Sequence, residues 1–558
     1  MKNNDWKTLD WISKTVGRHK IDILWLLLIQ IVLGISGVVN AFALRGLINS
    51  AVDGKMQVFW RASALFAGIT ILQILLRACF RFVEENCRAV MENRLKKRLF
   101  SALLHKDYGA VTRVHSGEWM NRLTSDTVVV ADGLAQIIPG LGGMLSRLVG
   151  AAVMLLVLEP RFGYVIVIGG GTLIGVSLVF RRILKRMHKG VQESDGKVRV
   201  LLQEYLSSML VVRAFSKEKD AETVADHQMA GHKAARLKRV RFSNFCNVGM
   251  GVAMHGTYAM GAIYCGFRIL HGTMTYGDFV AILQLINQVQ LPFANISGYL
   301  PRYYACLASA ERLMEVEAFT ENHEKALPME RFYEQEFQAM GLENVGFSYH
   351  DTAKDSEVVL EKLNFEIKKG EFVAFTGPSG CGKSTVLKLL MCLYKHDKGE
   401  RYICSQNENK PLTEAYRGLF AYVPQGNHLM SGAIREVVAF GDPKGMAQED
   451  KLRRALEIAC ADDFVYELEM GLDTVLGERG TGLSEGQMQR IAIARAIFSE
   501  HPVLMLDEAT SSLDEATEAR LLQNLRTMTD RTVLLVTHRP AALRVCDRQI
   551  NFGGKNNE

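Results

Sequence analysis

The sequence predicts a multidomain membrane protein: an all-α domain of six membrane-spanning helices, followed by an α/β domain that contains a phosphate-binding loop. Three observations lead to this prediction. Six long apolar segments lie before about residue 305 of the 558-residue chain. The pattern G-x-x-x-x-G-K-[ST] occurs after them, at 377–384. Runs typical of strands and of helices alternate around that pattern, as in an α/β fold.

The six apolar segments each reach the length of about 20 residues that a membrane-spanning helix needs. They cover approximately 21–44, 58–83, 133–158, 161–183, 246–270 and 278–300. Short connectors join them in pairs, and two long basic stretches, 84–132 and 184–245, join the pairs to one another. Positive charge near helix ends stays in the cytoplasm. We therefore expect both long stretches and both termini to be cytoplasmic.

The two long stretches also carry acidic residues, which alternate with the basic ones at helical intervals. This pattern indicates solvated helix faces rather than a nucleic-acid surface. The net charge of +6 is modest for this length and agrees with that interpretation. We expect cytoplasmic helical extensions with bends near 116–118 and 206–216, and no nucleic-acid partner.

The remaining regions complete the domain plan. Residues 1–20 place Trp6, Trp11 and Val16 at roughly helical spacing. That spacing favours an amphipathic helix on the inner membrane surface, with a disordered tail as the alternative. The membrane domain then covers 21–314, a polar linker covers 315–338, and the α/β domain covers 339–558.

The phosphate-binding loop lies between an alternating run, 371–376, and the helix-like run 386–390. In this context glycines let successive backbone N–H groups point at phosphate oxygens, and the helix N-terminus adds its positive end. Lys383 would reach the β- and γ-phosphates, and Ser384 would ligate Mg²⁺. The candidate nucleotide-binding residues of the loop are Gly377, Pro378, Ser379, Gly380, Cys381, Gly382, Lys383, Ser384 and Thr385.

Polar side chains also follow three other apolar strands. Asp507 ends the run 503–506 and is predicted to hold the Mg²⁺ sphere, and Glu508 beside it is a candidate general base. His538 follows the run 532–537, where it would bond a phosphate or orient the attacking water. Gln425 ends the stretch Tyr422-Val-Pro-Gln425, at the end of a predicted strand, and would bridge metal and water. Together these residues predict a P-loop ATPase domain that uses ATP and Mg²⁺.

A further candidate anion site lies in Leu483-Ser-Glu-Gly-Gln487, which opens a predicted helix. Ser484 and Gly486 would bind an anion there through a hydroxyl, backbone N–H groups and the helix dipole.

These motifs together resemble the ATP-binding cassette (ABC) transporters, in the layout of a half-transporter of the exporter superfamily. The resemblance covers nearly the whole chain, from about Trp6 to His538. It implies that 377–385 is the Walker A motif, that 503–507 is Walker B and that Glu508 is the catalytic glutamate. It also implies roles for Gln425 (Q-loop), His538 (switch histidine), Asp514 (D-loop), Tyr349 (stacking on adenine), and Ser484, Gly486 and Gln487 (signature). The third signature residue, commonly glycine, is Glu485 here.

The same resemblance implies a mechanism. ATP is held between the loop of one chain and the signature of another, so the working unit is a dimer, either of two such chains or with a different partner chain. We expect ATP-driven export of an amphipathic small molecule, lipid or peptide by alternating access, in a bacterial plasma membrane. An importer of a metal-chelate or siderophore with the same fold is the alternative. A soluble cassette protein acting on DNA or ribosomes lacks membrane spans, and an ATP-gated channel is disfavoured by the resemblance.

Polar residues within the predicted spans are the candidate substrate cavity, because such residues are functional by default. Arg147 lies near the middle of the third span with no acidic residue at mid-span to pair with it, which favours neutral or anionic cargo. The other candidates are His255, Gln284, Gln288 and Asn295. The alternative for this set is hydrogen bonding between helices.

Overall fold

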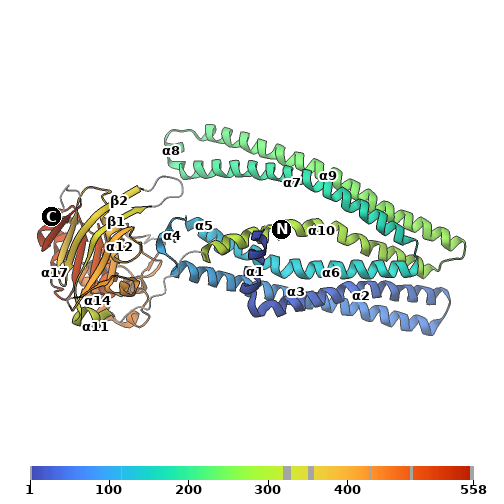
Figure 1. Cartoon of the computed structure of the whole chain (residues 1–558), viewed down its shortest axis with the longest axis horizontal. Coiled ribbons are helices and arrows are strands. Elements are labelled where there is room, and N and C mark those ends of the chain that lie inside the picture. Colours follow the sequence, from blue (N-terminus) through green and yellow to red (C-terminus); the bar gives the residue numbers. More distant parts are fainter. Residues whose placement is uncertain are drawn as a thin grey trace. The chain divides into compact units, whose positions relative to one another are not determined.

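The computed structural model describes residues 3–114, 116–317, 329–349, 357–406, 408–426, 429–477 and 482–552. The chain divides into two compact units, one of residues 1–99 with 121–315 and one of residues 100–120 with 316–558. The first unit is helical, and the second contains the sheets (Figure 1).

Six long helices make up most of the helical unit (Figure 1). They are α2 (Lys20–Val52), α3 (Met56–His105), α6 (Thr127–Leu158), α7 (Phe162–Ser207), α9 (Glu218–Leu270) and α10 (Tyr276–Glu317). Each of the six predicted spans lies on one of these helices, except that the fourth begins one residue before α7. The side chains of 165–179 on α7 lie outside the described residues.

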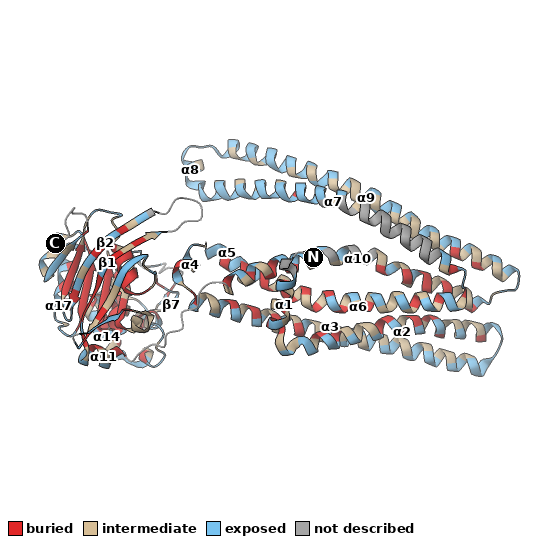
Figure 2. Ribbon diagram, in the orientation of Figure 1, coloured by how far each residue is buried: buried red, intermediate tan, exposed pale blue. Residues whose placement is uncertain are grey.

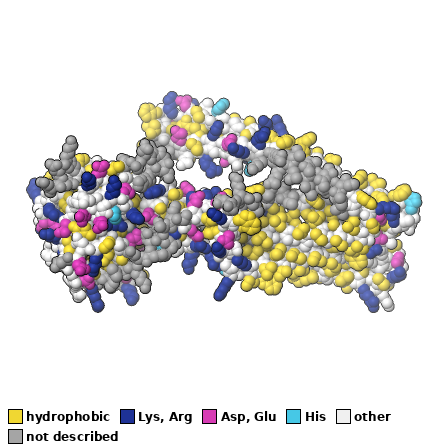
Figure 3. All heavy atoms as spheres, in the orientation of Figure 1, with side chains coloured by type: hydrophobic (Ala, Val, Ile, Leu, Met, Phe, Trp, Pro, Cys, Tyr) yellow, Lys and Arg dark blue, Asp and Glu magenta, His cyan; other side chains and the backbone are white. Residues whose placement is uncertain are grey.

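Three helical stretches within the described part of the chain are long and apolar enough to cross a membrane: Trp6–Val52, Met56–His105 and Ser116–Leu158. Their apolar side chains remain largely exposed, as with Leu75 at 62% and Phe82 at 77% on α3. Figure 3 shows such side chains gathered where α2, α3 and α6 lie. A surface of this kind suits contact with lipid rather than water.

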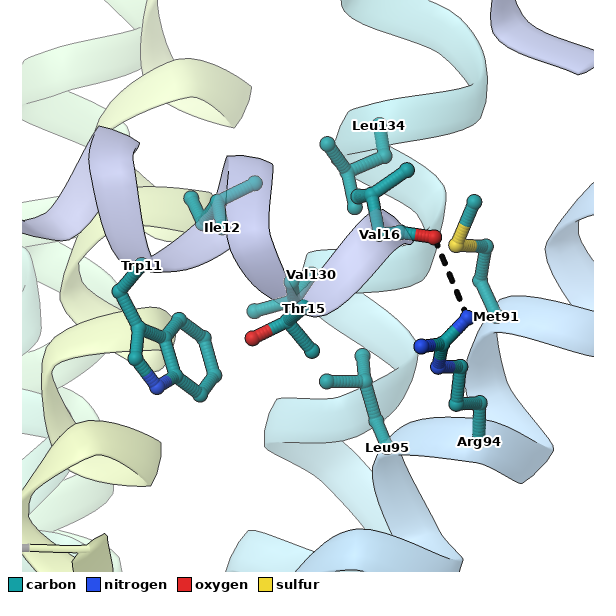
Figure 4. A pocket seen from close by; sticks show the side chains of 9 residues that line it. All are labelled: Trp11, Ile12, Thr15, Val16, Met91, Arg94, Leu95, Val130 and Leu134. Atoms are coloured by element: carbon teal, nitrogen blue, oxygen red, sulfur yellow. Dashed lines mark hydrogen bonds between the residues drawn. The ribbon is translucent and has the colours of Figure 1, made fainter. Parts of the chain in front are cut away.

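The predicted N-terminal helix is α1 (Asn3–Val16), which packs on α3 and α6 (Figure 4). Ile12 and Val16 are buried, and Met91 and Val130 are buried beside them. Arg94 donates to the carbonyl of Val16 at 3.3 Å, which satisfies a backbone acceptor at the end of the helix. The amphipathic pattern therefore marks a helix with one face packed on the membrane domain.

The two predicted bends are short helices in the structure. The first stretch contains α4 (Tyr108–Thr112), α5 (Ser116–Asn121) and a π-helical turn, Arg122–Asp126. Helix α5 begins at Ser116, beside the predicted 116–118, and Asp107 caps the preceding α4 by accepting from Ala110 N at 2.8 Å. The second bend is α8 (Met209–Ala214), within the predicted 206–216.

The predicted linker and domain boundary differ slightly from the structure. Helix α10 continues to Glu317, and 318–328 lie outside the described residues. Helix α11 (Met329–Gln335) lies in the predicted linker, and strand β1 (Phe337–Tyr349) begins in it, two residues before 339.

The second unit contains a parallel sheet of order β11-β3-β10-β9-β6. Its strands are β3 (Phe372–Thr376), β6 (Phe420–Val423), β9 (Val503–Asp507), β10 (Thr532–Val536) and β11 (Arg548–Asn551). Every residue of β9 and β10 is buried, as expected for parallel strands covered on both faces (Figure 2).

An antiparallel sheet and several helices complete the unit. The sheet has the order β2-β1-β4-β5, where β2 is Glu357–Lys368, β4 is Lys398–Ser405 and β5 is Glu408–Pro411. A small pair is formed by β7 (Gly432–Ala433) and β8 (Val475–Leu476). The helices are α12 (Lys383–Leu390), α13 (Ile434–Val438), α14 (Glu449–Ile458), α15 (Asp462–Glu467), α16 (Glu485–Phe498), α17 (Glu515–Arg526) and α18 (Pro540–Val545).

Candidate nucleotide site and substrate path

The predicted nucleotide residues follow four parallel strands. The loop 377–382 follows β3, Asp507 and Glu508 lie at the end of β9, His538 follows β10, and Gln425 follows β6. Because β10 lies between β3 and β9, and β9 lies beside β6, the carboxyl ends of these strands meet at one edge. Ligands of open α/β sheets bind outside that edge.

The loop needs its glycines. Gly377, Gly380 and Gly382 have φ of 137°, 82° and 94°, a region that favours glycine. A Cβ on Gly377 would lie 2.6 Å from the carbonyl oxygen of Phe552, and Gly382 is the N-cap of α12. Lys383 is buried, and its ammonium donates to the carbonyls of Gly377 at 2.8 Å and Pro378 at 2.9 Å. The loop thus holds its cation within reach of the backbone that would cradle phosphate.

Asp507 joins the loop to the neighbouring strands. Its Oδ1 accepts from Ser384 Oγ at 2.9 Å, and its Oδ2 accepts from Tyr422 Oη at 2.9 Å. Burial raises the pKa of Asp507, and the hydrogen bonds from Ser384 and Tyr422 oppose that rise. Burial and the neighbouring Asp507 both raise the pKa of Tyr422, so its hydroxyl stays a donor. Ser384 and Asp507, both predicted to hold Mg²⁺, thus lie side by side, and sequence reasoning missed Tyr422.

These donors fit a magnesium site. Hydroxyl and carboxylate oxygens are the ligands Mg²⁺ prefers, and it is usually held by one or two protein groups together with substrate phosphates. Ser384 and Asp507 supply such a pair. Among the described residues, no group of three or more His, Cys, Asp or Glu side chains gathers as a separate metal site.

Glu508 lies next to Asp507 in a left-handed backbone conformation, with φ of 51°. This conformation is unfavourable for a non-glycine residue by about 1–2 kcal/mol. The amide of Glu508 donates to the carbonyl of Val536 at 3.1 Å, which fixes the turn to β10. Its Oε2 accepts from Gln425 Nε2 at 2.7 Å. Gln425 therefore orients the candidate base, whereas His538 lies exposed at the end of β10.

Tyr349 lies beside the loop, where its hydroxyl is 3.1 Å from Thr385 Oγ1. Its ring packs edge-on against Phe347 at 4.9 Å and Tyr394 at 5.7 Å between centroids. The structure thus brings the predicted adenine-stacking residue to the phosphate loop.

The signature residues begin α16. Ser484 Oγ accepts from Gln487 N at 3.3 Å, and Gln487 Oε1 accepts from Ser484 N at 2.9 Å, which together form a capping box. A Cβ on Gly486 would lie 2.9 Å from the carbonyl oxygen of Ser512. Glu485 is exposed on the first turn.

Asp514 is likewise a helix cap. Its Oδ1 accepts from Thr517 N at 2.9 Å at the start of α17, and this bonding lowers the pKa of the carboxyl. Sequence reasoning missed the capping roles of Asp514 and Ser484. The S-x-x-Q spacing from Ser484 to Gln487 is the signal that could have shown the cap at Ser484.

The predicted cavity residues differ in how far they are buried. Arg147 on α6 and Gln284 on α10 are half-buried, and His255 on α9 and Asn295 on α10 are exposed. Gln288 donates from Nε2 to the carbonyl of Gly37 on α2 at 2.8 Å. For Gln288, hydrogen bonding between helices is therefore present, as the alternative interpretation allowed.

Comparisons with known proteins agree with both units. The family model described as "ABC transporter transmembrane region" matches residues 23–293, and the model described as "ABC transporter" matches 360–511. The chain is 30% identical over 450 residues to "ABC transporter B family member 1" of Dictyostelium discoideum, covering 80% of this chain and 48% of that protein. It is 28% identical over 482 residues to "Multidrug resistance ABC transporter ATP-binding and permease protein" of Lactococcus lactis, covering 84% of this chain and 80% of that protein.

A solved structure of a bacterial Atm1-family ABC exporter with ATP bound has the same fold. Its TM-score is 0.77 at 21% identity, and the match covers 96% of this chain and 94% of that chain. The predicted fold class and family resemblance are confirmed. The chain belongs to the ABC transporters, with the exporter-type half-transporter layout of a helical transmembrane domain followed by one α/β nucleotide-binding domain.

Proposed function

We propose that two such chains, or this chain and a related partner, form an ATP-driven transporter that exports an amphipathic small molecule, lipid or peptide. The main support is the joining, in one chain, of a membrane domain to a hydrolytic constellation. That constellation is the Ser384–Asp507 pair at 2.9 Å and the Gln425–Glu508 pair at 2.7 Å. The relatives favour export over the alternative of metal-chelate import, since those cited include a multidrug resistance transporter.

Each group at the strand edge has a role in the proposed hydrolysis. The loop and Lys383 bind the phosphates of ATP, and Tyr349 packs on the adenine. Ser384 and Asp507, with Gln425 nearby, would hold Mg²⁺, which neutralises charge on the phosphates when bound. Glu508, oriented by Gln425, accepts a proton from the attacking water. His538 orients that water or contacts the γ-phosphate.

A second chain would complete the site with its signature, through Ser484, Gly486, Gln487 and the nearby Asp514. The cytoplasmic bend made by α8 and its C-cap residue supports such a dimer, because Leu210 is 83% exposed and Phe215 is 73% exposed. Exposed apolar residues at a bend outside the membrane suit a protein partner. In this proposal six spans cross a bacterial plasma membrane, and both termini and the nucleotide-binding domain are cytoplasmic.

Antiparallel contacts between α2 and α10 define a polar row in the proposed substrate path. Arg45 Nε lies 2.5 Å from Asp278 Oδ1, and Gln288 bonds Gly37 two turns farther along. This register places Asn40 opposite Gln284. Oxygens of all three amides, Asn40 Oδ1, Gln284 Oε1 and Gln288 Oε1, are buried and lack a hydrogen-bond partner within the described structure.

Unpaired buried oxygens in an apolar setting are costly, so their retention favours a functional role. Because Gln288 donates its Nε2 to the carbonyl of Gly37, the amide is fixed and its Oε1 is left as a free acceptor. Such a row suits a ligand that donates hydrogen bonds, and Arg147 disfavours cations. A neutral amphipathic molecule with hydroxyl or amide N–H groups meets both conditions.

Replacing Glu508 with Gln removes the proposed base and keeps the side-chain shape. We expect ATP hydrolysis to fall by about 10²-fold or more, the usual contribution of a general base. ATP affinity should stay within a few-fold of wild type. Phosphate release and equilibrium ATP binding measure the two effects. Hydrolysis close to wild type would remove Glu508 from this role.

Replacing Ser484 with Arg blocks the start of α16 while leaving the phosphate loop intact. We expect hydrolysis to fall by about 10²-fold, as when a preorganised donor to the transition state is lost. Glu485→Gly, one residue along, is the matched control and should retain activity. Normal turnover in Ser484→Arg would contradict the shared site.

Replacing Asp507 with Asn should abolish Mg²⁺-dependent hydrolysis and stabilise the ligand-free protein by about 1 kcal/mol at neutral pH. Burial raises the pKa of Asp507 above its unfolded value, so the folded state binds the proton more tightly. The stability contributed by protonated Asp507 is therefore present at low pH and lost as pH rises through the folded pKa.

The Asn variant has no such loss, so its Tm advantage should grow over the pH range that begins near 3.8, the usual pKa of an aspartate carboxyl. Thermal unfolding of both variants across this range tests the sign, with exposed Asp450→Asn as the control. An advantage that shrinks with rising pH would contradict the assignment.

Replacing Asn40 or Gln284 with Leu removes an unpaired buried oxygen. We expect Tm to rise by about 2–4 °C, equivalent to about 1 kcal/mol. ATPase stimulation by a panel of lipids, peptides, drugs and metal-chelates should fall. Gln290→Leu is the matched control with the opposite sign, because it breaks the bond from Gln290 Nε2 to Met254 O at 2.9 Å. Lower Tm with unchanged stimulation in the Asn40 and Gln284 variants would exclude a substrate role.

A further inference from the structure

A basic segment of α9 lies just before the fifth predicted span (Figure 1). Its five cations are Lys233, Arg236, Lys238, Arg239 and Arg241. The chain has no Asp or Glu from residue 227 to residue 277, so no acid of α9 itself is near them. Arg239 Nη1 lies 3.1 Å from His188 Nδ1 on α7. Within the part of the chain that the structure describes, the other four cations have no ion pair or side-chain hydrogen bond.

The outer face of α9 changes from basic to apolar within one turn. Lys238 and Arg241 are exposed, as are Phe245 at 71% and Val248 at 65%. At 100° per residue these four side chains lie on one face of the helix. A rise of about 1.5 Å per residue places Arg241 about 6 Å, and Lys238 about 10 Å, before Phe245 along the axis. The apolar face lies in the region 23–293 that matches the transmembrane family model.

Cations farther from the apolar face have acidic partners within the chain. On α7, Arg199 lies 3.4 Å from Asp195. Directly before α9, Lys217 lies 2.8 Å from Asp220. The acid-free part of α9 is therefore the part next to the apolar face. Like charges at helical spacing repel one another, so this part of the helix is stabilised by an anion from outside the chain.

We propose that Lys238 and Arg241 bind the phosphate of an anionic lipid whose acyl chains lie along the face that begins with Phe245. The inference rests on the proposed topology, in which this part of α9 is cytoplasmic and the lipid belongs to the inner leaflet. Clusters of four or more Lys and Arg directly beside a span attract the anionic headgroups of that leaflet. This lipid is not the cargo, because the proposed substrate path lies on α2 and α10.

The two side chains suit different parts of this task. The guanidinium of Arg241 is planar and matches the oxygens of a phosphate in a two-pronged hydrogen bond. The long stem of Lys238 can lie along the helix while its ammonium reaches the headgroup. Lys233, Arg236 and Arg239 add to the attraction within a Debye length or two. The adjoining apolar face favours a lipid over a soluble anion or a nucleic acid, since neither of these would cover it.

Lipid binding to the purified full-length protein tests the proposal. Phosphatidylglycerol or phosphatidylcholine with the same acyl chains is added in detergent, and the bound lipids are counted by native mass spectrometry. Each cation near an anionic headgroup contributes about fivefold to affinity. We therefore expect the wild-type protein to prefer phosphatidylglycerol by about tenfold or more. High salt should reduce this preference.

The double variant Lys238→Gln with Arg241→Gln should lose about tenfold of the preference. The exchange Lys238→Arg with Arg241→Lys keeps both charges and should retain it within a few-fold, which separates loss of the site from loss of the fold. Arg199→Gln with Lys217→Gln is the matched control. It removes the same charge from the same hairpin, farther from the apolar face, and should leave the preference unchanged.

Four outcomes would overturn the lipid site. The first is equal preference in the wild-type protein and the double variant, and the second is an equal fall in the matched control, which would indicate net charge alone. The third is glycerol phosphate binding as tightly as phosphatidylglycerol, which would indicate a free anion. The fourth is loss of the dimer mass in the double variant with lipid preference retained, which would assign this face to a second copy of the chain.

ATP hydrolysis by the same preparations is a separate measurement of the proposed function. A wild-type protein that hydrolyses no ATP in either lipid would overturn the proposed function, while its lipid preference would still decide the lipid site. An active wild-type protein without any preference would overturn the lipid site alone.

Discussion

The nucleotide site depends on the order of strands in the parallel sheet. Because β10 is inserted between β3 and β9, the phosphate loop, the acidic pair and the histidine emerge along one edge. With β6 beside β9, Gln425 joins them. The short contacts of the site, from Ser384 to Asp507 and from Gln425 to Glu508, follow from this arrangement. Strands β9 and β10 are buried along their whole length, so the edge is a rigid support.

Several residues of the site on that edge are in environments or backbone conformations that are unfavourable for the stability of the fold. Asp507 is 1% exposed, Lys383 is 5% exposed, and Glu508 has a positive φ. Each would be selected against if stability alone mattered, and such features persist where the surrounding structure determines them. The buried core beside them supplies the stability that allows it. These unfavourable features are confined to the edge, because the rest of β9 is apolar and β10 has Thr532, at its opposite end, as its one polar residue.

Sequence reasoning succeeded where chemistry and chain position coincide. The loop 377–384, Asp507 and the six long helices are each defined by contiguous residues, and all were predicted. It failed where the partner is distant in sequence. Tyr422 bonds Asp507 across 85 positions, and Arg539 meets Ser511 across 28, and nothing in the local pattern of either residue marks the contact. The N-cap of α4 at Asp107 was likewise not recognised, because its partner Ala110 N is a backbone group that the sequence pattern does not mark.

The cap at Ser484 is compatible with the proposed ligand role. The hydroxyl accepts one hydrogen bond, from Gln487 N, and a hydroxyl also has a hydrogen to donate. A phosphate oxygen can take that hydrogen and still face the positive end of α16. Glu485 opposes the binding of a phosphate there, because its negative carboxylate lies on the same first turn. Its side chain is exposed, so solvent screens the repulsion. In the proposed shared site, Glu485 would therefore weaken the attraction for phosphate without removing the donors of the signature.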